Sequence, residues 1–528
     1  MELNLQNITT AINKLNRCNV ATFKDAGDSF VHFTLSLEVE SFRHLKDLNV
    51  KFQHPVSVIS GSNKIGKTSL LILIACSHEK LMKVDSTSPN GDIREHVWKD
   101  LINFTSHETD TSDYSYKMSW RVGQSPIKRG EGKRLASSKA WGGLAKKSSA
   151  QDRTNAKIRD REVRFIDLER ILPARSFSNA LYRKANAATK VRLDLKIEKA
   201  FSYIFDLPDV KIFQAGKHVN KSCFFIKHSD SEYSSYNAAS GEEAIIYLLI
   251  DISGTPDNSL ILVDEIEAGF HPNIQRKIAK IIQYISWTEK KQFIITTHSP
   301  SLMSAFPRKS RIFIENQNGN HRAISGLAAQ AVASKMDSIG HPLLTLYCED
   351  DLAAFLIGKI LQKLSSIYQY FSRLIQIVES GPVNQVKNDY VRHKRNFSYL
   401  RNKVGYAAVF DGDYKDHHDY AVYFQNDSEN TCFIYPYEAP EKFLVRSYLN
   451  SFPNTELQSA LVHTDHHCLF QEMVNLNLAT DVSDARSSCY SAFKTVPEFN
   501  KHAADLESFL KTVVKHFTEV VVESDEHA

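Results

Sequence analysis

The sequence lacks the features that would place the protein in or across a membrane. Apolar runs such as Leu70–Ala75 are far shorter than the roughly 20 residues needed to span a bilayer. Met1–Asn4 is not a charged segment leading into an apolar one, as a secretory signal peptide would be. The seven cysteines are odd in number and include no Cys-x-x-Cys pair, which favours reduced thiols. We therefore expect a cytoplasmic protein with no membrane partner.

The chain has little net charge, but its positive charge is concentrated in one segment. The whole sequence of 528 residues carries a net charge of +4, whereas Arg121–Arg164 holds thirteen Lys or Arg residues against four acidic ones. With little periodicity around Lys128–Ser149, this segment is interpreted as a basic insertion or long loop. It could contact nucleic acid, with Trp141 stacking on a base, or simply be a solubilising loop.

A P-loop pattern, G-x-x-x-x-G-K-[ST], occurs at Gly61–Ser69. Val56–Ser60 before it predicts a strand, and Leu70–Ala75 after it predicts a helix. Backbone N–H groups of such a loop hold phosphate oxygens at the positive end of the helix. We expect Lys67 to contact the β- and γ-phosphates of ATP and Thr68 to bind Mg²⁺. The other residues expected at the nucleotide from this loop are Gly61, Asn63, Gly66 and Ser69.

Two later apolar runs end in residues suited to ATP hydrolysis. Leu260–Val263 predicts a buried parallel strand, at whose end Asp264 would hold Mg²⁺ and Glu265 would polarise the attacking water. Phe293–Ile295 predicts a second strand, which leads to His298 beside the γ-phosphate. These motifs follow the order used by ABC-type ATPases.

The segment Ser240-Gly241-Glu242-Glu243 begins a helical stretch, Ala244–Ile250. Its acidic first turn suits a helix N-terminus, and this alone could explain the motif. In ABC-type folds, however, the serine and glycine at these positions face nucleotide bound by a partner subunit. Because each motif occurs once, we expect a homodimer or higher homo-oligomer with composite ATP sites.

The chain is too long for one ordinary domain. An ABC-type α/β head is expected over residues 1–340, with a link near Ala328–Ile339. A second strand–helix region follows, with strands expected at Pro342–Cys348, Leu374–Val378 and Tyr406–Phe410 and a helix at Leu352–Leu364.

Acidic residues follow two of these strands. Glu349 comes after the first, and Asp411-Gly412-Asp413 comes after the last. In an extended backbone Asp411 and Asp413 would project to one side, and with Glu349 they would form an oxygen site for Mg²⁺ or Mn²⁺ suited to phosphodiester cleavage. Solvated carboxylates at strand ends are the competing interpretation. A separate group fits no standard zinc spacing and is interpreted as a polar surface: His463, His466, His467 and Cys468.

An ABC-type head followed by Glu349 and Asp411-Gly412-Asp413 resembles the OLD (overcoming lysogenization defect) family. The resemblance covers most of the chain and implies a smaller Toprim-like α/β domain over residues 341–528. Family members include nucleases and ATPases of bacterial anti-phage defence, such as Gabija, Septu-type and retron-associated systems. Asp350 stands where the family has glycine, and Asp351 matches a later acid only approximately. Lys501 and Lys511 are candidates for a late lysine near the metals.

The resemblance implies an ATPase whose ATP state controls cleavage of DNA or RNA at its own Toprim site. The alternative is a regulatory ATPase with a degenerate Toprim domain that scaffolds a separate HNH-type nuclease. A chromosome-maintenance ATPase is a third interpretation. The absence of heptad-bearing coiled-coil arms between Lys67 and Asp264 argues against it.

Overall fold

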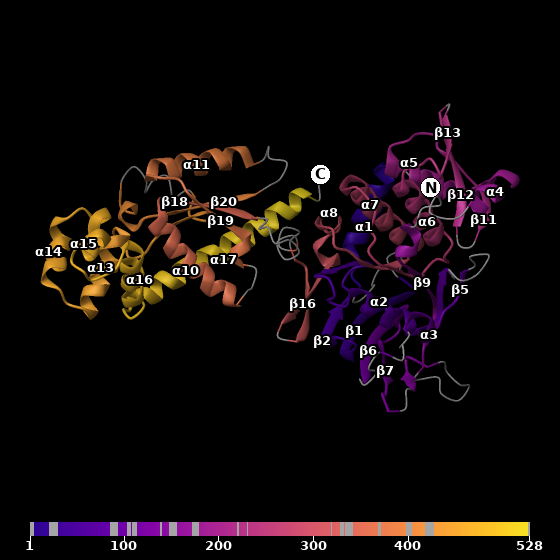
Figure 1. Cartoon of the computed structure of the whole chain (residues 1–528), viewed down its shortest axis with the longest axis horizontal. Coiled ribbons are helices and arrows are strands. Elements are labelled where there is room, and N and C mark those ends of the chain that lie inside the picture. The colour runs from indigo at the N-terminus through magenta and orange to yellow at the C-terminus, as the bar shows by residue number, and fades with distance from the viewer. Residues whose placement is uncertain are drawn as a thin grey trace. The chain divides into compact units, whose positions relative to one another are not determined.

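The computed structural model separates into two compact units, Met1–Val332 and Ala333–Ala528 (Figure 1). The expected link at 328–339 lies outside the described residues apart from Val332. Among the described residues, no helix is long and apolar enough to cross a bilayer. The structure describes residues 5–20, 30–84, 93–102, 107, 113–137, 140–146, 156–171, 179–218, 221–229, 231–317, 319–327, 332, 342–367, 371–397, 404–417 and 427–525.

The first unit is built on a sheet in which the strands carrying the nucleotide motifs are neighbours. The strand order is β17-β16-β3-β15-β14-β9-β4-β5, with parallel pairing except at the two edge strands. Every residue of β3, β14 and β15 is buried, as in a parallel sheet covered on both faces. The strands are β3 (Val56–Gly61), β4 (His78–Val84), β5 (Ile93–Glu95), β9 (Ile158–Ile166), β14 (Leu260–Val263), β15 (Gln292–Thr296), β16 (Arg311–Gln317) and β17 (Asn320–Ser325).

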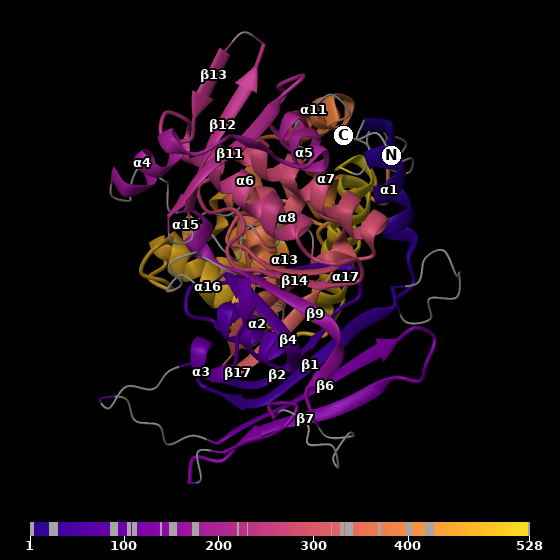
Figure 2. The same ribbon diagram turned by 90° about the vertical axis from the view of Figure 1, so that its right-hand side faces the viewer.

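Helices cover both faces of this sheet (Figure 2). The almost wholly buried α2 lies between it and a second, antiparallel sheet, whereas α6 and α7 pack on the opposite face. The helices of the unit are α1 (Leu5–Arg17), α2 (Lys67–Cys76), α3 (Trp98–Leu101), α4 (Asn179–Ala187), α5 (Leu195–Phe205), α6 (Ser240–Ser253), α7 (Pro272–Glu289) and α8 (Pro300–Ser304), with short 3₁₀ turns η1 (Leu168–Ile171) and η3 (Arg308–Ser310).

The second sheet of this unit has the order β2-β1-β6-β7-β8 and corrects the prediction of a basic loop. Part of the predicted loop, Lys128–Arg134, is the strand β7, which pairs along its length with β6. The end of the basic segment is β9, a central strand beside the one carrying Asp264. The strands of this sheet are β1 (His32–Phe42), β2 (Leu45–Lys51), β6 (Tyr114–Val122), β7 (Lys128–Arg134) and β8 (Trp141–Gly143).

A third sheet, β10-β11-β12-β13, is antiparallel and stands beside α4. The segment Ala187–Phe205 has helical spacing, but a short strand interrupts it before α5 begins at Leu195. Asp194 ends this interruption by accepting a hydrogen bond from Lys196 N at 2.7 Å, which caps α5. The strands are β10 (Val191–Arg192), β11 (Lys211–His218), β12 (Lys221–His228) and β13 (Ser231–Ser234).

The second unit has a four-stranded, all-parallel sheet of order β19-β18-β20-β21, which confirms the three predicted strands. The helix α11 packs on one face, and α10 and α17 pack on the other (Figure 1). A group of helices, α13 to α16, follows the sheet. The elements are β18 (Leu344–Cys348), α10 (Asp351–Ile367), η4 (Phe371–Leu374), β19 (Ile375–Glu379), α11 (Val383–Asn396), β20 (Gly405–Phe410), η6 (Gly412–Tyr414), β21 (Thr431–Phe433), α13 (Pro440–Ser451), α14 (Thr455–His463), η7 (His466–Cys468), α15 (Leu469–Asn475), α16 (Val482–Phe493) and α17 (Glu498–Asp525).

Candidate nucleotide site and carboxylate site

The P-loop joins β3 to α2 in the predicted manner. Gly61 ends the strand, and Gly66 caps the helix with a left-handed φ of 99°. A Cβ on Gly66 would lie 2.5 Å from a methyl carbon of Leu45, so the turn has room only for glycine. Asn63 lies in the exposed turn of the loop, whereas Ser69 is buried in the first turn of α2. The free N–H groups of this first turn give the loop its anion-binding character.

Lys67 is folded over the mouth of this loop. Its Nζ donates to the carbonyl oxygens of Gly61 at 2.9 Å and Ser62 at 3.1 Å. Burial lowers the pKa of Lys67 to about 8, although the carboxylates of Asp264 and Glu265 favour the charged form. Phosphate oxygens could replace the two carbonyls as acceptors, and the lysine is thus held where the sequence motif predicts.

Asp264 is held by two hydroxyl groups at the end of β14. Thr68 Oγ1 donates to Asp264 Oδ2 at 2.8 Å, and Thr296 Oγ1 donates to Asp264 Oδ1 at 2.5 Å. Thr296 also accepts the backbone N–H of Glu265 at 2.9 Å. The structure therefore brings Thr68 and Asp264 together as a pair of oxygen donors that suits Mg²⁺. Thr296, the last residue of β15, was not predicted as a site residue.

His298 lies beside Glu265, as the strand order predicts. Its Nε2 is 3.9 Å from Glu265 Oε1, and its backbone N–H donates to the carboxylate of Glu267. Burial, followed by the charge of Lys67, lowers the pKa of His298. A neutral imidazole can accept or donate a proton near a phosphate. Glu265 is half-exposed and has a φ of 44°. Glu265 can therefore serve as the base for a water molecule, with His298 as its partner.

Ser240 and Gly241 begin α6, as predicted. The helix start is organised by Glu242, whose carboxylate accepts the backbone N–H of Ala239 at 3.1 Å and the hydroxyl of Tyr233 at 2.8 Å. A Cβ at Gly241 would lie 3.4 Å from the carbonyl oxygen of Gly269, in the loop that follows Asp264 and Glu265. The motif thus has the helix-capping function expected from its sequence, and its contact with a second subunit stays a prediction.

In the second unit, Glu349 and Asp411 follow the neighbouring parallel strands β18 and β20. Glu349 Oε1 accepts the backbone N–H of Asp411 at 3.4 Å. Burial raises the pKa of Glu349 to about 7, helped by the charges of Asp413 and Asp350, and burial with the charge of Glu349 raises that of Asp411 to about 9. Asp411 Oδ1 is buried and accepts no hydrogen bond from the described residues. Carboxyl ends of parallel strands are where open α/β sheets bind ligands.

Asp413 is placed differently from the prediction. The backbone is not extended after Asp411, because residues Gly412–Tyr414 turn at once into η6. Gly412 allows this turn by fitting against the chain after β21, where a Cβ would lie 2.4 Å from the carbonyl oxygens of Ile434 and Pro436. Asp413 is therefore exposed, although its charge still raises the pKa values of Glu349 and Asp411.

The acids after Glu349 have structural partners. Asp350 Oδ1 accepts the backbone N–H groups of Leu352 at 3.0 Å and Ala353 at 2.9 Å and so caps α10. Asp351 forms a two-point ion pair with Arg486, at 2.9 and 3.2 Å. These contacts explain both departures from the family pattern without a metal.

The two candidate lysines differ in their surroundings. Lys501 lies over the ring of Tyr435, 4.2 Å from its centroid, just after β21. Lys511 instead lies 3.7 Å from the carboxylate of Glu507 within α17. The contact of Lys501 with the segment that follows a sheet strand makes it the better candidate.

Glu441 lies near this group and follows the apolar run Phe433–Tyr437 in the sequence, although it is not among the predicted site residues. It is the second residue of α13 and is 5% exposed. Its charge contributes to the raised pKa of Asp411.

The basic segment does not leave Trp141 free to stack on a base. Trp141 stacks on Trp98, with ring centroids 4.0 Å apart, and Arg134 is buried over the Trp141 ring. Arg161 is also buried, with one N–H donating to Gln292 Oε1 at 2.9 Å. The positive side chains exposed on β7 are Lys128, Arg129 and Lys133.

Comparison with known proteins identifies the nucleotide-binding part. Residues 56–304 match a family model described as an AAA domain, putative AbiEii toxin, Type IV TA system. This region contains all the ATPase motifs above, and it is similar to that family of P-loop ATPase domains. The search of curated proteins found no match.

Solved structures similar to the chain include heads of SMC proteins. The SMC head domain from Thermotoga maritima is 11% identical, with a TM-score of 0.32, over 55% of this chain and 98% of that one. An SMC head bound to the C-winged helix domain of ScpA is 15% identical, with a TM-score of 0.33, over 56% and 97%. A head with an extended coiled coil, bound to the C-terminal domain of ScpA derived from Pyrococcus furiosus, is 11% identical, with a TM-score of 0.33, over 56% and 96%.

Proposed function

We propose that the protein is an ATP-dependent switch of bacterial anti-phage defence whose second unit is a Toprim-like, metal-dependent nuclease. The nucleotide state of an ATPase domain over residues 1–340 would control cleavage of DNA or RNA by a Toprim-like domain over residues 341–528. The family match of residues 56–304, whose description names a toxin of a toxin–antitoxin system, supports the defence setting. The domain limits, the OLD-family relationship and the cytoplasmic location belong to the same proposal.

The residues of the first unit fit ATP and Mg²⁺. The P-loop is built so that only glycine fits at Gly66, and Lys67 extends across its mouth toward two carbonyl oxygens. Thr68 and Asp264 already share a hydrogen bond, the pairing expected of two groups that would hold one ion. When bound, Mg²⁺ would neutralise charge on the β- and γ-phosphates. Glu265 would orient the attacking water, and His298 would stabilise it from the side.

One observation carries the nuclease part of the proposal: beside Glu349, Asp411 has a buried carboxylate oxygen that accepts no hydrogen bond within the described part of the chain. A buried carboxylate left unsatisfied is costly, whereas a divalent cation would satisfy both acids at once. Bound there, Mg²⁺ or Mn²⁺ would activate water and stabilise the leaving oxygen of a phosphodiester. Exposed Asp413 would supply a further oxygen from the turn η6.

The experiment is a nuclease assay of the full-length protein with Mn²⁺ and ATP, comparing Asp411→Asn with the parent on DNA and RNA. We expect Asp411→Asn to lose at least about 100-fold in cleavage while it still binds ATP. Without ATP, Mn²⁺ should raise the melting temperature of the parent more than that of Asp411→Asn, because the variant lacks a ligand of the second-unit site.

The matched control is Asp351→Asn, which makes the same change at a neighbouring aspartate that pairs with Arg486. It should cleave like the parent. Parent protein that takes up no Mn²⁺, or Asp411→Asn that cleaves as fast as the parent, would contradict the nuclease proposal.

A second function is favoured by the acids that follow Glu349. Because Asp350 caps α10 and Asp351 pairs with Arg486, the site has fewer free carboxylates than the family pattern. The alternative is a regulatory ATPase whose degenerate second unit scaffolds a separate HNH-type nuclease. In that case the purified protein alone would cleave nothing, and cleavage would appear only after a nuclease partner is added.

A further inference from the structure

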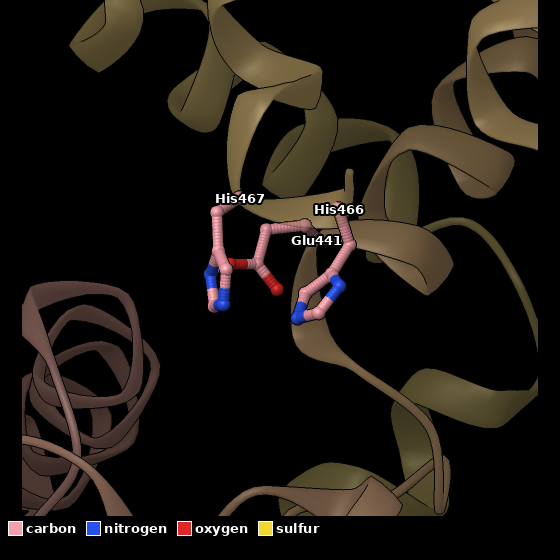
Figure 3. A group of neighbouring side chains, drawn as sticks. All are labelled: Glu441, His466 and His467. Carbon is pink, nitrogen blue, oxygen red and sulfur yellow. The ribbon is translucent and has the colours of Figure 1, made fainter. Parts of the chain in front are cut away.

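A second group of potential metal ligands lies in the helical part of the second unit. Glu441 of α13 stands between the imidazoles of His466 and His467 of η7 (Figure 3). One ligand atom from each of the three lies within 4.8 Å of the others. His467 Nδ1 is 3.2 Å from Glu441 Oε1, and the two imidazole centroids are 4.0 Å apart. The fold thus brings Glu441 together with two adjacent histidines that follow it by 25 and 26 positions.

We propose that Glu441, His466 and His467 bind one transition-metal ion, with Zn²⁺ as the best fit. Two imidazole nitrogens and one carboxylate form a borderline-soft set that suits Zn²⁺ better than Mg²⁺ or Ca²⁺. With bonds of about 2.0–2.1 Å, neighbouring ligands of tetrahedral Zn²⁺ lie roughly 3.3 Å apart. The contact of His467 with Glu441 already has this spacing, and rotation of the half-exposed His466 ring would draw in the third ligand.

The surrounding chain holds these ligands in place. Asp465 Oδ1 accepts the backbone N–H of His467 at 3.0 Å and so fixes the start of η7. The same oxygen lies 3.7 Å from His466 Nδ1, where it can orient that ring and leave Nε2 for the metal. Glu441 is fixed by burial in the first turn of α13, directly after Pro440.

Burial of Glu441 is the strongest reason to expect an ion. Its side chain is 7% exposed, whereas that of His467, its hydrogen-bonding partner, is 66% exposed. A contact with an exposed imidazole compensates a buried carboxylate poorly, and a metal ion would satisfy it better. A metal with three protein ligands also keeps a fourth position, which water or a phosphate oxygen can occupy.

This site is distinct from the Glu349 and Asp411 pair, although the two are neighbours. The charge of Glu441 acts on Asp411, and that of His467 acts on Glu349. The sets differ in chemistry: one has only carboxylate oxygens, and the other has two nitrogens. Each can therefore be tested by a metal that the other accepts poorly.

The experiment measures zinc content and Co²⁺ binding of the full-length, metal-stripped protein. We expect about one Zn²⁺ per chain, and Co²⁺ should give the visible absorption of tetrahedral coordination. His466→Ala, His467→Ala and Glu441→Gln should each weaken Zn²⁺ binding at least about 10-fold. The histidine changes lie at half-exposed or exposed positions, so unchanged circular dichroism can confirm that these variants fold.

Two controls separate this site from its surroundings and from the nuclease proposal. His463→Ala removes a nearby exposed histidine outside the group, and Asp411→Asn removes the neighbouring carboxylate; both should keep the Zn²⁺. The proposal would be overturned if only Asp411→Asn lost zinc, if the three ligand variants bound zinc like the parent, or if the protein bound no zinc at all. Because this experiment measures zinc binding, its outcome does not depend on whether the protein cleaves nucleic acid with Mn²⁺.

Discussion

At the scale of single residues, the ATPase site depends on hydroxyl groups that fix one carboxylate. Asp264 receives hydrogen bonds from Thr68 and Thr296, one to each oxygen. Thr296 in turn accepts the N–H of Glu265, which helps to hold the left-handed backbone of that residue. The two acids are therefore oriented from the neighbouring strand β15, and not by their own strand alone.

Thr296→Val should slow ATP hydrolysis more than it weakens ATP binding, since it removes both contacts without changing the volume of the side chain. A hydrogen bond to a charged group contributes about 1.5–3 kcal/mol, so turnover should fall on the order of 10-fold to 100-fold. Steady-state kinetics with ATP measures the effect. Thr296→Ser keeps the hydroxyl and should restore most activity; equal rates for Thr296→Val and the parent would exclude this positioning.

Residue-scale predictions from sequence succeed where a motif fixes the backbone. Lys67, Thr68 and Asp264 lie together as predicted, because P-loop geometry is local and its partner strand is recognisable. Asp413 was placed wrongly because its direction depends on a contact between Gly412 and a segment more than 20 residues later. Tertiary contacts of this kind have no local signature.

At the scale of elements, β7 shows that positive residues close together in the sequence can differ in their exposure to solvent. The strand pairs with β6 and presents Lys128, Arg129 and Lys133 to solvent, whereas Arg134 packs under the aromatic rings of Tyr114 and Trp141. Lys117 on the neighbouring strand β6 pairs with Glu40 and so adds little to this positive surface. Three exposed cations are thus available for a polyanion.

Neutralising Lys128, Arg129 and Lys133 to Gln should reduce the salt dependence of duplex DNA binding. Each lost phosphate contact lowers the slope of log K against log salt by about 0.9, so the slope should fall by up to about 2.7. Fluorescence anisotropy across a salt series measures it. The control replaces Lys211, Lys227 and Arg276, which are exposed elsewhere in the first unit; an identical slope in parent and β7 variant would leave only the solubilising interpretation.

Elements formed by apolar runs were predicted well, whereas an element whose place depends on contacts with distant residues was not. The buried strands before Asp264, Glu349 and Asp411 are continuous apolar runs, and each appears in the structure. The sequence of β9, by contrast, has four consecutive charged residues, Arg159 to Glu162, and the strand accommodates Arg161 and Arg164 because they donate to acceptors in other elements. Its membership of the central sheet depends on those distant acceptors and could not be read locally.

At the scale of the whole molecule, the first unit contains buried histidines that make its stability depend on pH. Burial lowers the pKa of His54 to about 4 and that of His78 to about 3. His54 links two elements, because its Nδ1 accepts the N–H of Val56 at 3.1 Å while Nε2 faces Asn16 Oδ1. Both histidines are therefore neutral in the folded state at neutral pH.

The free energy of unfolding of this unit should fall as pH decreases below about 6.5. There the unfolded chain takes up protons on these histidines, whereas the folded unit takes them up only near pH 3 to 4, so acid favours the unfolded state. We expect the melting temperature to drop by at least about 5 °C between about pH 7.5 and about pH 5. Differential scanning calorimetry measures the transition. His54→Gln, which can keep both hydrogen bonds, should reduce the drop, and an unchanged drop would show that other groups control it.

The whole molecule should also change its assembly with ATP. Each chain contains one P-loop and one Ser240-Gly241 motif, so two chains are needed to enclose two nucleotides. Glu265→Gln keeps the size of the side chain and removes its ability to take a proton from water. ATP turnover should fall at least about 100-fold, while the dimer persists in ATP and Mg²⁺, as measured by light scattering.

Two control variants test this assignment. Lys67→Ala should neither bind ATP nor dimerise. Glu232→Gln, at an exposed position paired with Lys190, should behave like the parent. Equal turnover by Glu265→Gln and the parent would rule out Glu265 as the residue that activates water.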